Sequence, residues 1–354
     1  NLILMFLFWE ITTIACWRLI GFFREKSIVF KADKAFLVTV FGALVMLLGF
    51  IMVYQQTGSF DMAVIKEALR YNKIPNLAVL LILFGILSKS ATLPLHTWLP
   101  DAGVAPSPVT ALLHAAVLVK IGVYAYARLF VVTMPPAEVW LTIVPVIAAI
   151  SALVSAGAAL VDTDMKRIIA YSTISQIGFI FLGLAVGNEI GIAGGILYIL
   201  MHGLAKGGLF LCAGIVEQKT HIKDITKMGG LIKVMPVTAV SFLLCAFSVM
   251  GIPPFGGFFS KYMVITGAVN QGNLWVTFTF VFGAFLTIIY LFRIFNAIFM
   301  GEMKTPVSGK EGYPSMVWSV ASLAVLSLVA GLLINYPAQF VQSTVQQMLG
   351  MVVR

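Results

Sequence analysis

The chain has 354 residues, of which 60% are hydrophobic and only 10% are charged, and its mean hydropathy is +1.01. Soluble domains contain about 25% charged residues, so this composition excludes an ordinary soluble protein and indicates an integral membrane protein. The net charge of +9 could suggest a nucleic-acid partner, but the positions of the basic residues, described below, indicate membrane topology instead.

Long apolar segments predict membrane-spanning helices. These segments are about 20 residues long, the length that a helix needs to cross a bilayer. They lack the alternation of a membrane β-barrel, so we predict an all-α, polytopic helix bundle. The ten predicted spans cover residues 1–23, 35–54, 75–98, 107–130, 139–161, 168–187, 191–216, 235–267, 273–300 and 314–336. Because the chain opens on Asn1 inside an apolar segment, without a signal peptide, we expect that part of the natural N-terminus is missing or that the chain is a segment of a longer one.

Prolines interrupt two of these spans. Pro94 lies in the third span and Pro253-Pro254 in the eighth. A pair of broken helices indicates a transporter, because irregular backbone at membrane depth must line a polar cavity. Beyond Pro337 we predict an amphipathic helix on the membrane surface, whose apolar face holds Phe340, Val341, Val345, Met348, Leu349 and Val352.

Acidic residues precede two of the helices. Asp162 and Asp164 come just before a helix that we expect to start near Met165, and Asp101 comes before the fourth span. Short acidic side chains commonly cap helix N-termini, so we predict capping roles for all three.

The basic residues outside the spans cluster in alternate gaps. Fourteen lie around the odd-numbered gaps, and the positive-inside rule places these gaps in the cytoplasm. They are Arg18, Arg24, Lys26, Lys31, Lys34, Lys166, Arg167, Lys219, Lys223, Lys227, Lys233, Arg293, Lys304 and Lys310. Five others, Lys66, Arg70, Lys73, Arg128 and Arg354, fall on the opposite side.

Seven ionisable residues lie well inside the predicted spans, away from their ends. They are Glu10, Lys89, His114, Lys120, His202, Lys206 and Lys261. A charged side chain at a helix centre costs about 2.5–3.5 kcal/mol even on the most lenient insertion scale. A single such lysine could be a structural partner of a carboxylate or of a backbone carbonyl, but so many in one bundle require a common explanation.

The chemistry of this set suits proton transfer. Burial favours the neutral forms of lysine and glutamate, whereas a neighbouring carboxylate favours the charged form of a lysine, so withdrawing Glu10 would make Lys89 release its proton. Histidine titrates near neutral pH and can relay between such groups. His202 and Lys206 are four residues apart and share a helical face. His114 and Lys120 are nearly two turns apart, so a water molecule could lie between their levels.

No residue pattern indicates a cofactor. Cys16, Cys212 and Cys245 lie within apolar spans, and their odd number without a CxxC pair argues against disulfides, iron–sulfur clusters and structural zinc. The chain has no Walker loop and no GxGxxG turn, so nucleotide binding is not expected. We therefore predict no cofactor and no metal in this chain.

Four sequence blocks in order resemble the antiporter-like subunits of respiratory complex I, Mrp sodium/proton antiporters and energy-converting membrane-bound hydrogenases. The blocks are KSATLPLHTWLPDAGVAPSPVTALLHAAVLVKIGVYAYARL, TDMKRIIAYSTISQIGF, LYILMHGLAKGGLFLCAG and GIPPFGGFFSKYM. The resemblance implies two inverted five-helix repeats, each with a broken helix, with the first four helices of the family missing here. It assigns residues 1–130 to a first half-channel, 131–300 to the second repeat, and 301–354 to a final span with a surface helix.

The resemblance also implies roles for the seven buried ionisable residues. Glu10 matches the family's carboxylate on its fifth helix, and Lys89 matches the partner of that carboxylate on the broken seventh. His114 and Lys120 fall on the eighth helix, His202 and Lys206 on the eleventh, and Lys261 on the broken twelfth. Together they form a predicted proton relay across the middle of the bundle.

Three functions are compatible with this pattern. The first is a proton-translocating subunit of a redox-driven complex, an oxidoreductase without a redox centre in this chain. The second is a subunit of an Mrp-type sodium/proton antiporter, and the third is a non-conducting scaffold. In each case the expected partners are other membrane subunits, including adjacent antiporter-like subunits and a redox or antiporter module, together with the lipid bilayer. The expected cargo is protons, with sodium as the alternative, and no nucleic acid is expected. The expected location is a prokaryotic cell membrane or an organelle inner membrane.

Overall fold

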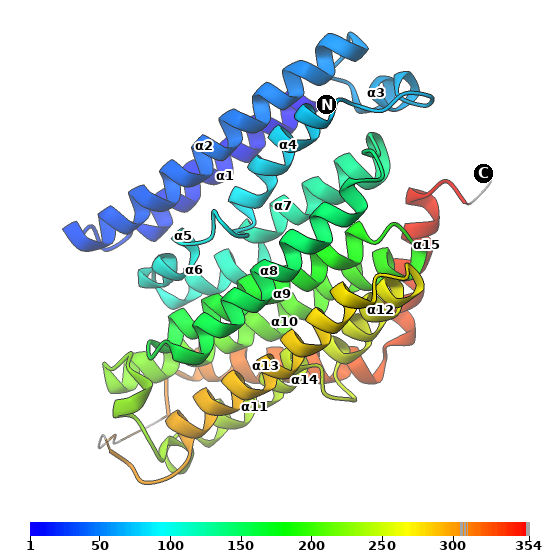
Figure 1. Ribbon diagram of the computed structural model, residues 1–354. Coiled ribbons are helices and arrows are strands. Elements are labelled where there is room, and N and C mark those ends of the chain that lie inside the picture. The colour runs from blue at the N-terminus through cyan, green and yellow to red at the C-terminus, as the bar shows by residue number, and fades with distance from the viewer. Residues whose placement is uncertain (305–306, 308, 310, 352–354) are drawn as a thin grey trace.

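The computed structural model describes residues 1–304, 307, 309 and 311–351, and within this part of the chain the fold is all-helical, with one isolated bridge between Asp164 and Asp224. Eight helices are long and apolar enough to cross a membrane: α1 (Leu2–Ile20), α2 (Lys26–Thr57), the segment Ser107–Thr133, α8 (Trp140–Val161), α9 (Met165–Ala185), α10 (Glu189–Thr220), α13 (Leu274–Phe299) and α14 (Pro314–Leu332). Two further crossings are interrupted, which confirms the predicted ten spans (Figure 1).

The segment Ser107–Thr133 is not a regular α-helix. Two α-helical stretches, α6 (Ser107–Ala111) and α7 (Leu118–Tyr126), alternate with two π-helical stretches, η2 (Leu112–Ala116) and η3 (Ala127–Thr133). Single π-helical turns are rare and occur frequently at functional sites. The first of them carries His114.

Both interrupted crossings begin with the same backbone motif. Helix α4 (Asn76–Lys89) ends where Ala91 takes the left-handed conformation and Thr92 N–H donates to Leu87 O at 2.9 Å. Helix α11 (Pro236–Met250) ends in the same way at Gly251, with Ile252 N–H donating to Phe247 O at 3.0 Å. This is the Schellman motif, which satisfies the last carbonyl groups of a helix.

The breaks therefore start before the prolines that predicted them. The third crossing stops at Lys89 and resumes in the short helix α5 (Trp98–Asp101), followed by the 3₁₀ turn η1 (Ala102–Val104). The eighth resumes in α12 (Gly256–Asn270). In both breaks the left-handed residue ends the first half-helix, and the prolines lie in the turn that follows.

Helices α9 and α10 form the centre of the bundle, where α12 crosses them at short range. Most residues of α9 are buried. A Cβ atom at Gly183 of α9 would lie 2.7 Å from Gly191 O and 2.9 Å from Gly195 Cα, both on α10. Glycine at these positions lets the backbones approach closely, as in other membrane helix pairs.

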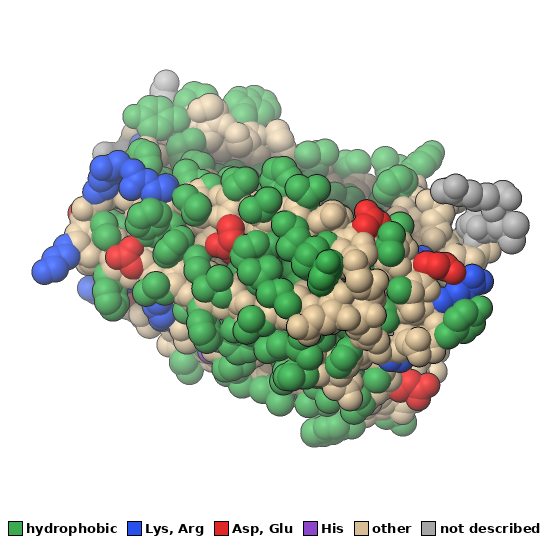
Figure 2. All heavy atoms as spheres, turned by 90° about the horizontal axis from the view of Figure 1, so that it is seen from above, with side chains coloured by type: hydrophobic (Ala, Val, Ile, Leu, Met, Phe, Trp, Pro, Cys, Tyr) green, Lys and Arg blue, Asp and Glu red, His purple; other side chains and the backbone are tan. Residues whose placement is uncertain are grey.

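Helices α1 and α2 form the outer edge of the bundle, and their outward faces are apolar. Leu4, Phe8, Phe30 and Leu37 are each more than half exposed. Figure 2 shows hydrophobic side chains over the middle of this face and basic side chains gathered toward its ends. This distribution is typical of a surface that faces lipid.

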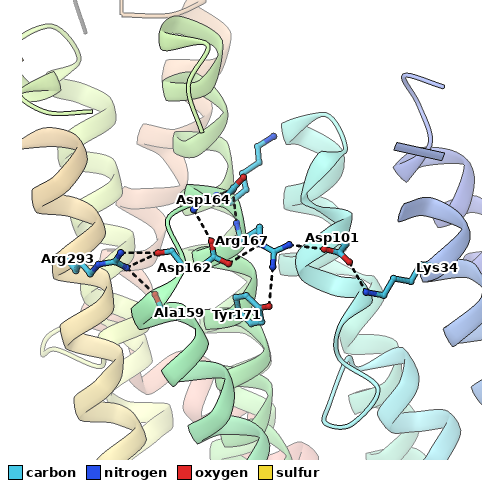
Figure 3. Close-up of polar contacts among 9 residues, drawn as sticks. Lys34, Asp101, Ala159, Asp162, Asp164, Arg167, Tyr171 and Arg293 are labelled. Carbon is cyan, nitrogen blue, oxygen red and sulfur yellow. Dashed lines mark hydrogen bonds and ion pairs between the residues drawn. The ribbon is translucent and has the colours of Figure 1, made fainter. Parts of the chain in front are cut away.

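The odd-numbered gaps lie together at one end of the bundle (Figure 1), which we call the basic end. A chain of charged contacts connects its helices (Figure 3). Lys34 of α2 pairs with Asp101 at 2.8 Å, Asp101 pairs with Arg167 of α9 at 2.8 Å, and Arg167 pairs with Asp162 at 2.9 Å. Arg293 of α13 donates to Asp162 O at 3.0 Å. Lys310 and Arg354 lie outside the described residues.

Only one of the three predicted acidic caps is confirmed. The Asp164 side chain accepts from the N–H groups of Lys166 and Arg167 at the start of α9. Asp101 and Asp162 instead pair with Arg167. The capping prediction was wrong for these two because the Arg167 guanidinium lies between them.

The predicted surface helix is present as α15 (Asn335–Met348), beginning two residues before Pro337. Val341 and Val345 are buried on it, and the Gln346 amide donates to Glu189 at the start of α10 at 3.0 Å. Phe340, predicted on the same apolar face, is exposed instead, and Val352 lies outside the described residues. The helix is therefore held by a narrower face than predicted.

Three shorter helical pieces complete the fold. Helix α3 (Met62–Ala68) follows α2, and the 3₁₀ turns η4 (Ile225–Lys227) and η5 (Leu231–Lys233) follow α10.

Candidate functional site

The four predicted relay lysines and both relay histidines are buried in the bundle, and Glu10 is half-buried. None of the four lysines has a carboxylate within ion-pair distance among the described residues; each ammonium group donates to a backbone carbonyl, and two of them also donate to a hydroxyl group. We refer to Glu10, Lys89, His114, Lys120, His202, Lys206 and Lys261 as the buried relay.

Lys89 lies against α1, next to Glu10 but not paired with it. Its Nζ donates to Thr13 Oγ1 at 2.5 Å and to Trp9 O at 3.1 Å, and lies 5.4 Å from the Trp9 ring centroid. Glu10 Oε1 is buried without a hydrogen-bond partner. Lys89 thus contacts Trp9 and Thr13, which lie on either side of Glu10 along α1, so the amine and the carboxylate are neighbours without forming an ion pair.

His114 has no polar partner among the described residues. It is fully buried, its ring lies 4.5 Å from that of Phe210, and neither ring nitrogen forms a hydrogen bond. His202 is likewise buried with both ring nitrogens unpaired. Buried polar groups of this kind are positions at which ordered water binds, so both imidazoles suit a hydrated path.

Lys120 reaches across to α10. Its Nζ donates to Ile199 O at 2.7 Å, and a Cβ atom at Gly203 would lie only 2.9 Å from that nitrogen. Gly203 adjoins His202 in the sequence, so the ammonium group reaches α10 close to the level of the histidine. The absence of a side chain at position 203 makes this approach possible.

Lys206 is fully buried. Its Nζ donates to Ser172 Oγ at 2.6 Å and to Ile169 O at 3.1 Å, both on α9. The ammonium group therefore lies between the two central helices.

Lys261 binds the end of a half-helix. Its Nζ donates to Val249 O at 2.8 Å, in the last turn of α11. The negative end of a helix dipole stabilises a cation at this position. The same nitrogen lies 4.6 Å from the Phe179 ring centroid and 5.9 Å from that of Tyr198.

A hydrogen-bonded cluster that the sequence analysis did not identify connects the surroundings of Lys206 and Lys261. Ser172 Oγ and Tyr290 OH lie 2.8 Å apart, and the Gln176 amide donates to Tyr290 OH at 3.2 Å. Tyr198 OH donates to Gln176 Oε1 at 2.6 Å. The available signal was the four-residue spacing of Ser172 and Gln176 in TDMKRIIAYSTISQIGF, which puts two polar side chains on one face of a buried helix.

This cluster predicts the effect of Tyr290→Phe. The change removes a hydroxyl that Ser172 and Gln176 share in the interior, so we expect a loss of about 1–3 kcal/mol of stability. The midpoint of thermal unfolding of the purified complex should fall, whereas Tyr71→Phe, at an exposed tyrosine, should leave it unchanged. An unchanged midpoint for both variants would contradict the assigned hydrogen bonds.

The described residues contain no group of three or more His, Cys, Asp or Glu side chains that could hold a metal ion. The arrangement instead offers amines and imidazoles at successive levels of the bundle, each close to a carbonyl, hydroxyl or unpaired ring nitrogen.

Comparison with known proteins shows which family shares this arrangement. Residues 1–287 match the family model described as NADH:quinone oxidoreductase/Mrp antiporter, transmembrane. The chain belongs to this family. It is 34% identical over 362 residues to the A1 subunit of the Na(+)/H(+) antiporter of Staphylococcus saprophyticus, covering 94% of this chain and 45% of that protein. It is also 36% identical over 368 residues to a Na(+)/H(+) antiporter subunit of Alkalihalophilus pseudofirmus. That match covers 95% of this chain and 45% of that protein.

Two solved complexes contain chains of the same fold. One is the Mrp complex from Dietzia sp. DQ12-45-1b, with a TM-score of 0.93 and 24% identity over 99% of this chain and 74% of that one. The other is the membrane-bound sulfane sulfur reductase, an archaeal respiratory membrane complex. The TM-score is 0.88 with 26% identity, and the match covers 97% of this chain and 71% of that one. The family, the all-helical fold and the multi-pass membrane location are therefore as predicted. The chain spans less than half the length of the two antiporter subunits.

Proposed function

We propose that this chain is a proton-translocating, antiporter-like unit of a multi-subunit Mrp-type sodium/proton antiporter. The observation that carries the proposal is the set of four buried lysines that lack ion-pair partners among the described residues and lie on carbonyl and hydroxyl groups. Intramembrane lysines pair with other charged groups or with backbone carbonyls, and such residues mark ion pathways and proton relays in pumps and transporters. Four of them in one bundle, together with two buried imidazoles, suit proton transfer better than four separate structural contacts.

The proposed path follows the buried relay. A proton would pass from the neighbourhood of Glu10 and Lys89 to Lys120 with His114, then to Lys206 with His202, and finally to Lys261. Movement of Glu10 toward or away from Lys89 would change the affinity of that amine for a proton. Residues 1–130 would hold the first half of the path and residues 131–300 the second, with residues 301–354 closing the bundle.

The choice of sodium/proton antiport depends on the relatives. The two antiporter subunits exceed 30% identity over nearly the whole of this chain, so this alternative is favoured over a redox-driven complex. The likeness to a chain of a respiratory complex keeps the redox-driven function as the second candidate. Both would operate with other membrane subunits as partners, in a prokaryotic cell membrane.

The two candidates can be separated with the intact complex. We expect the complex, purified in mild detergent and reconstituted into vesicles, to move protons when a sodium gradient is imposed, without any electron donor. Co-purified iron–sulfur or nickel–iron subunits, together with translocation that requires an electron donor, would instead establish the redox-driven function. If replacing the buried lysines lowered only the yield of the complex and left its proton translocation unchanged, the non-conducting scaffold would be supported.

A further inference from the structure

A further buried lysine, Lys166, pairs with a glutamate near the basic end. Lys166, predicted as a loop residue, has only 5% of its side chain exposed, and its Nζ lies 2.6 Å from Glu217 Oε2 of α10. The same nitrogen lies 3.4 Å from Ala105 O. Glu217 Oε1 lies 3.4 Å from Lys223 Nζ. We call Lys166 and Glu217 the entry pair.

Exposure increases in steps along this cluster. The side chain of Lys166 is 5% exposed, that of Glu217 is 23% exposed and that of Lys223 is 49% exposed. One carboxylate therefore contacts a buried amine with one oxygen and a solvent-accessible amine with the other. A group in this position can exchange protons with water on one side and with the protein interior on the other.

The two residues of the entry pair lie on the same two helices, α9 and α10, that enclose Lys206. Glu217 follows Lys206 by eleven residues on α10, which is about three turns and the same helical face. Lys166 precedes Ile169 by three residues on α9, and Ile169 O is the carbonyl that binds Lys206. Both helices thus place a member of the entry pair in line with the Lys206 ammonium.

His114 packs against α10 between these two levels. Its ring lies 4.5 Å from that of Phe210, which follows Lys206 by four residues and precedes Glu217 by seven. Its ring nitrogens are buried and have no hydrogen-bond partner among the described residues. An imidazole without protein partners, placed between two amines, can receive a proton through bound water and pass it on.

Local backbone pairing holds the entry pair in place. Met165 N–H donates to Lys223 O, and Ile225 N–H donates to Thr163 O, each at 2.9 Å. These bonds join the start of α9 to the loop after α10. The pair therefore stays at the basic end without depending on a flexible loop.

We propose that the entry pair is the site at which the buried relay exchanges protons with the solution at the basic end. This proposal depends on the proposed function. A proton leaves the Lys166 ammonium for His114, the Glu217 carboxylate takes a proton from hydronium in the adjacent solution, and that proton passes to the Lys166 amine, which restores the ion pair. Only N–H and O–H bonds form and break.

Lys166→Arg separates this role from a structural ion pair. Arginine keeps the charge beside Glu217 but does not release its proton. We expect the complex to assemble in normal yield while sodium-driven proton translocation falls about 100-fold, the size of a typical proton-transfer contribution. Lys66→Arg, at an exposed lysine near the opposite end, should behave like the wild type. Wild-type transport in Lys166→Arg would overturn the proposal.

Glu217→Gln provides a second test should the arginine not fit. We expect sodium-driven proton translocation to fall about 100-fold, the size of a typical proton-transfer contribution. Glu67→Gln, which removes an exposed carboxylate from its pair with Arg70, is the matched control. Wild-type transport by Glu217→Gln would contradict the entry role. Should Lys206→Met also transport normally, the proposed function itself would fail.

Discussion

Lys206→Met is expected to lower proton translocation by the intact complex about 100-fold, because a positioned proton donor and acceptor typically contributes a factor of this size. Lys206 is fully buried between α9 and α10, where its ammonium group binds Ser172 Oγ and Ile169 O. Methionine has a similar length and shape and needs no polar partner, so the helices should stay packed. The rate of sodium-driven pH change in vesicles measures the effect.

A matched variant on the same helix tests whether position matters. Lys219 is half-buried in the last turn of α10, at the basic end, so Lys219→Met removes the same charge outside the buried relay. We expect near-normal transport from it. Equal transport by the Lys206 and Lys219 variants, at equal amounts of assembled complex, would show that the buried amine carries no protons.

Gly183→Leu is expected to destabilise the complex by about 1–3 kcal/mol or more through overpacking. Already the Cβ atom of the new side chain would lie 2.7 Å from Gly191 O and 2.8 Å from Val264 Cγ2. The first contact is with backbone, which cannot move aside as a flexible side chain can. Helices α9, α10 and α12 would separate at the level where they cross, and the midpoint of thermal unfolding should fall.

Gly157→Leu is the corresponding control. Gly157 lies on α8, is half-buried, and a Cβ atom there would meet no other atom within 4 Å. Both variants lose a glycine from an apolar helix, which by itself raises helix propensity. Equal thermal midpoints for the two would mean that the close crossing at Gly183 does not limit stability.

Much of the fold could be predicted from the chain because lipid imposes strong rules. Apolar length located the spans, and alternate gaps rich in lysine and arginine assembled at one end, as Figure 1 shows. The exact ends of the broken helices could not be predicted. At Lys89 the ending depends on Ala91 adopting a left-handed conformation, and no side-chain pattern signals this for alanine.

The candidate site was only partly predictable. Lysines such as Lys120 and Lys261 stand out because a charge in an apolar run is costly. The groups that bind these lysines do not stand out in the sequence. They are backbone carbonyls such as Ile199 O and Val249 O, and every residue type has a backbone carbonyl. Lys166 was predicted to lie in a loop because it directly follows a predicted span, yet the fold buries it against Glu217, fifty-one positions away.

The charged contacts in Figure 3 oppose large movements of the helices relative to one another. Lys34, Asp101, Arg167, Asp162 and Arg293 join α2, α9 and α13 across the width of the bundle. Rigid-body rocking of one half of the helix bundle against the other would break these contacts in every transport cycle. The architecture instead favours a stationary scaffold in which side chains and protons are the moving parts.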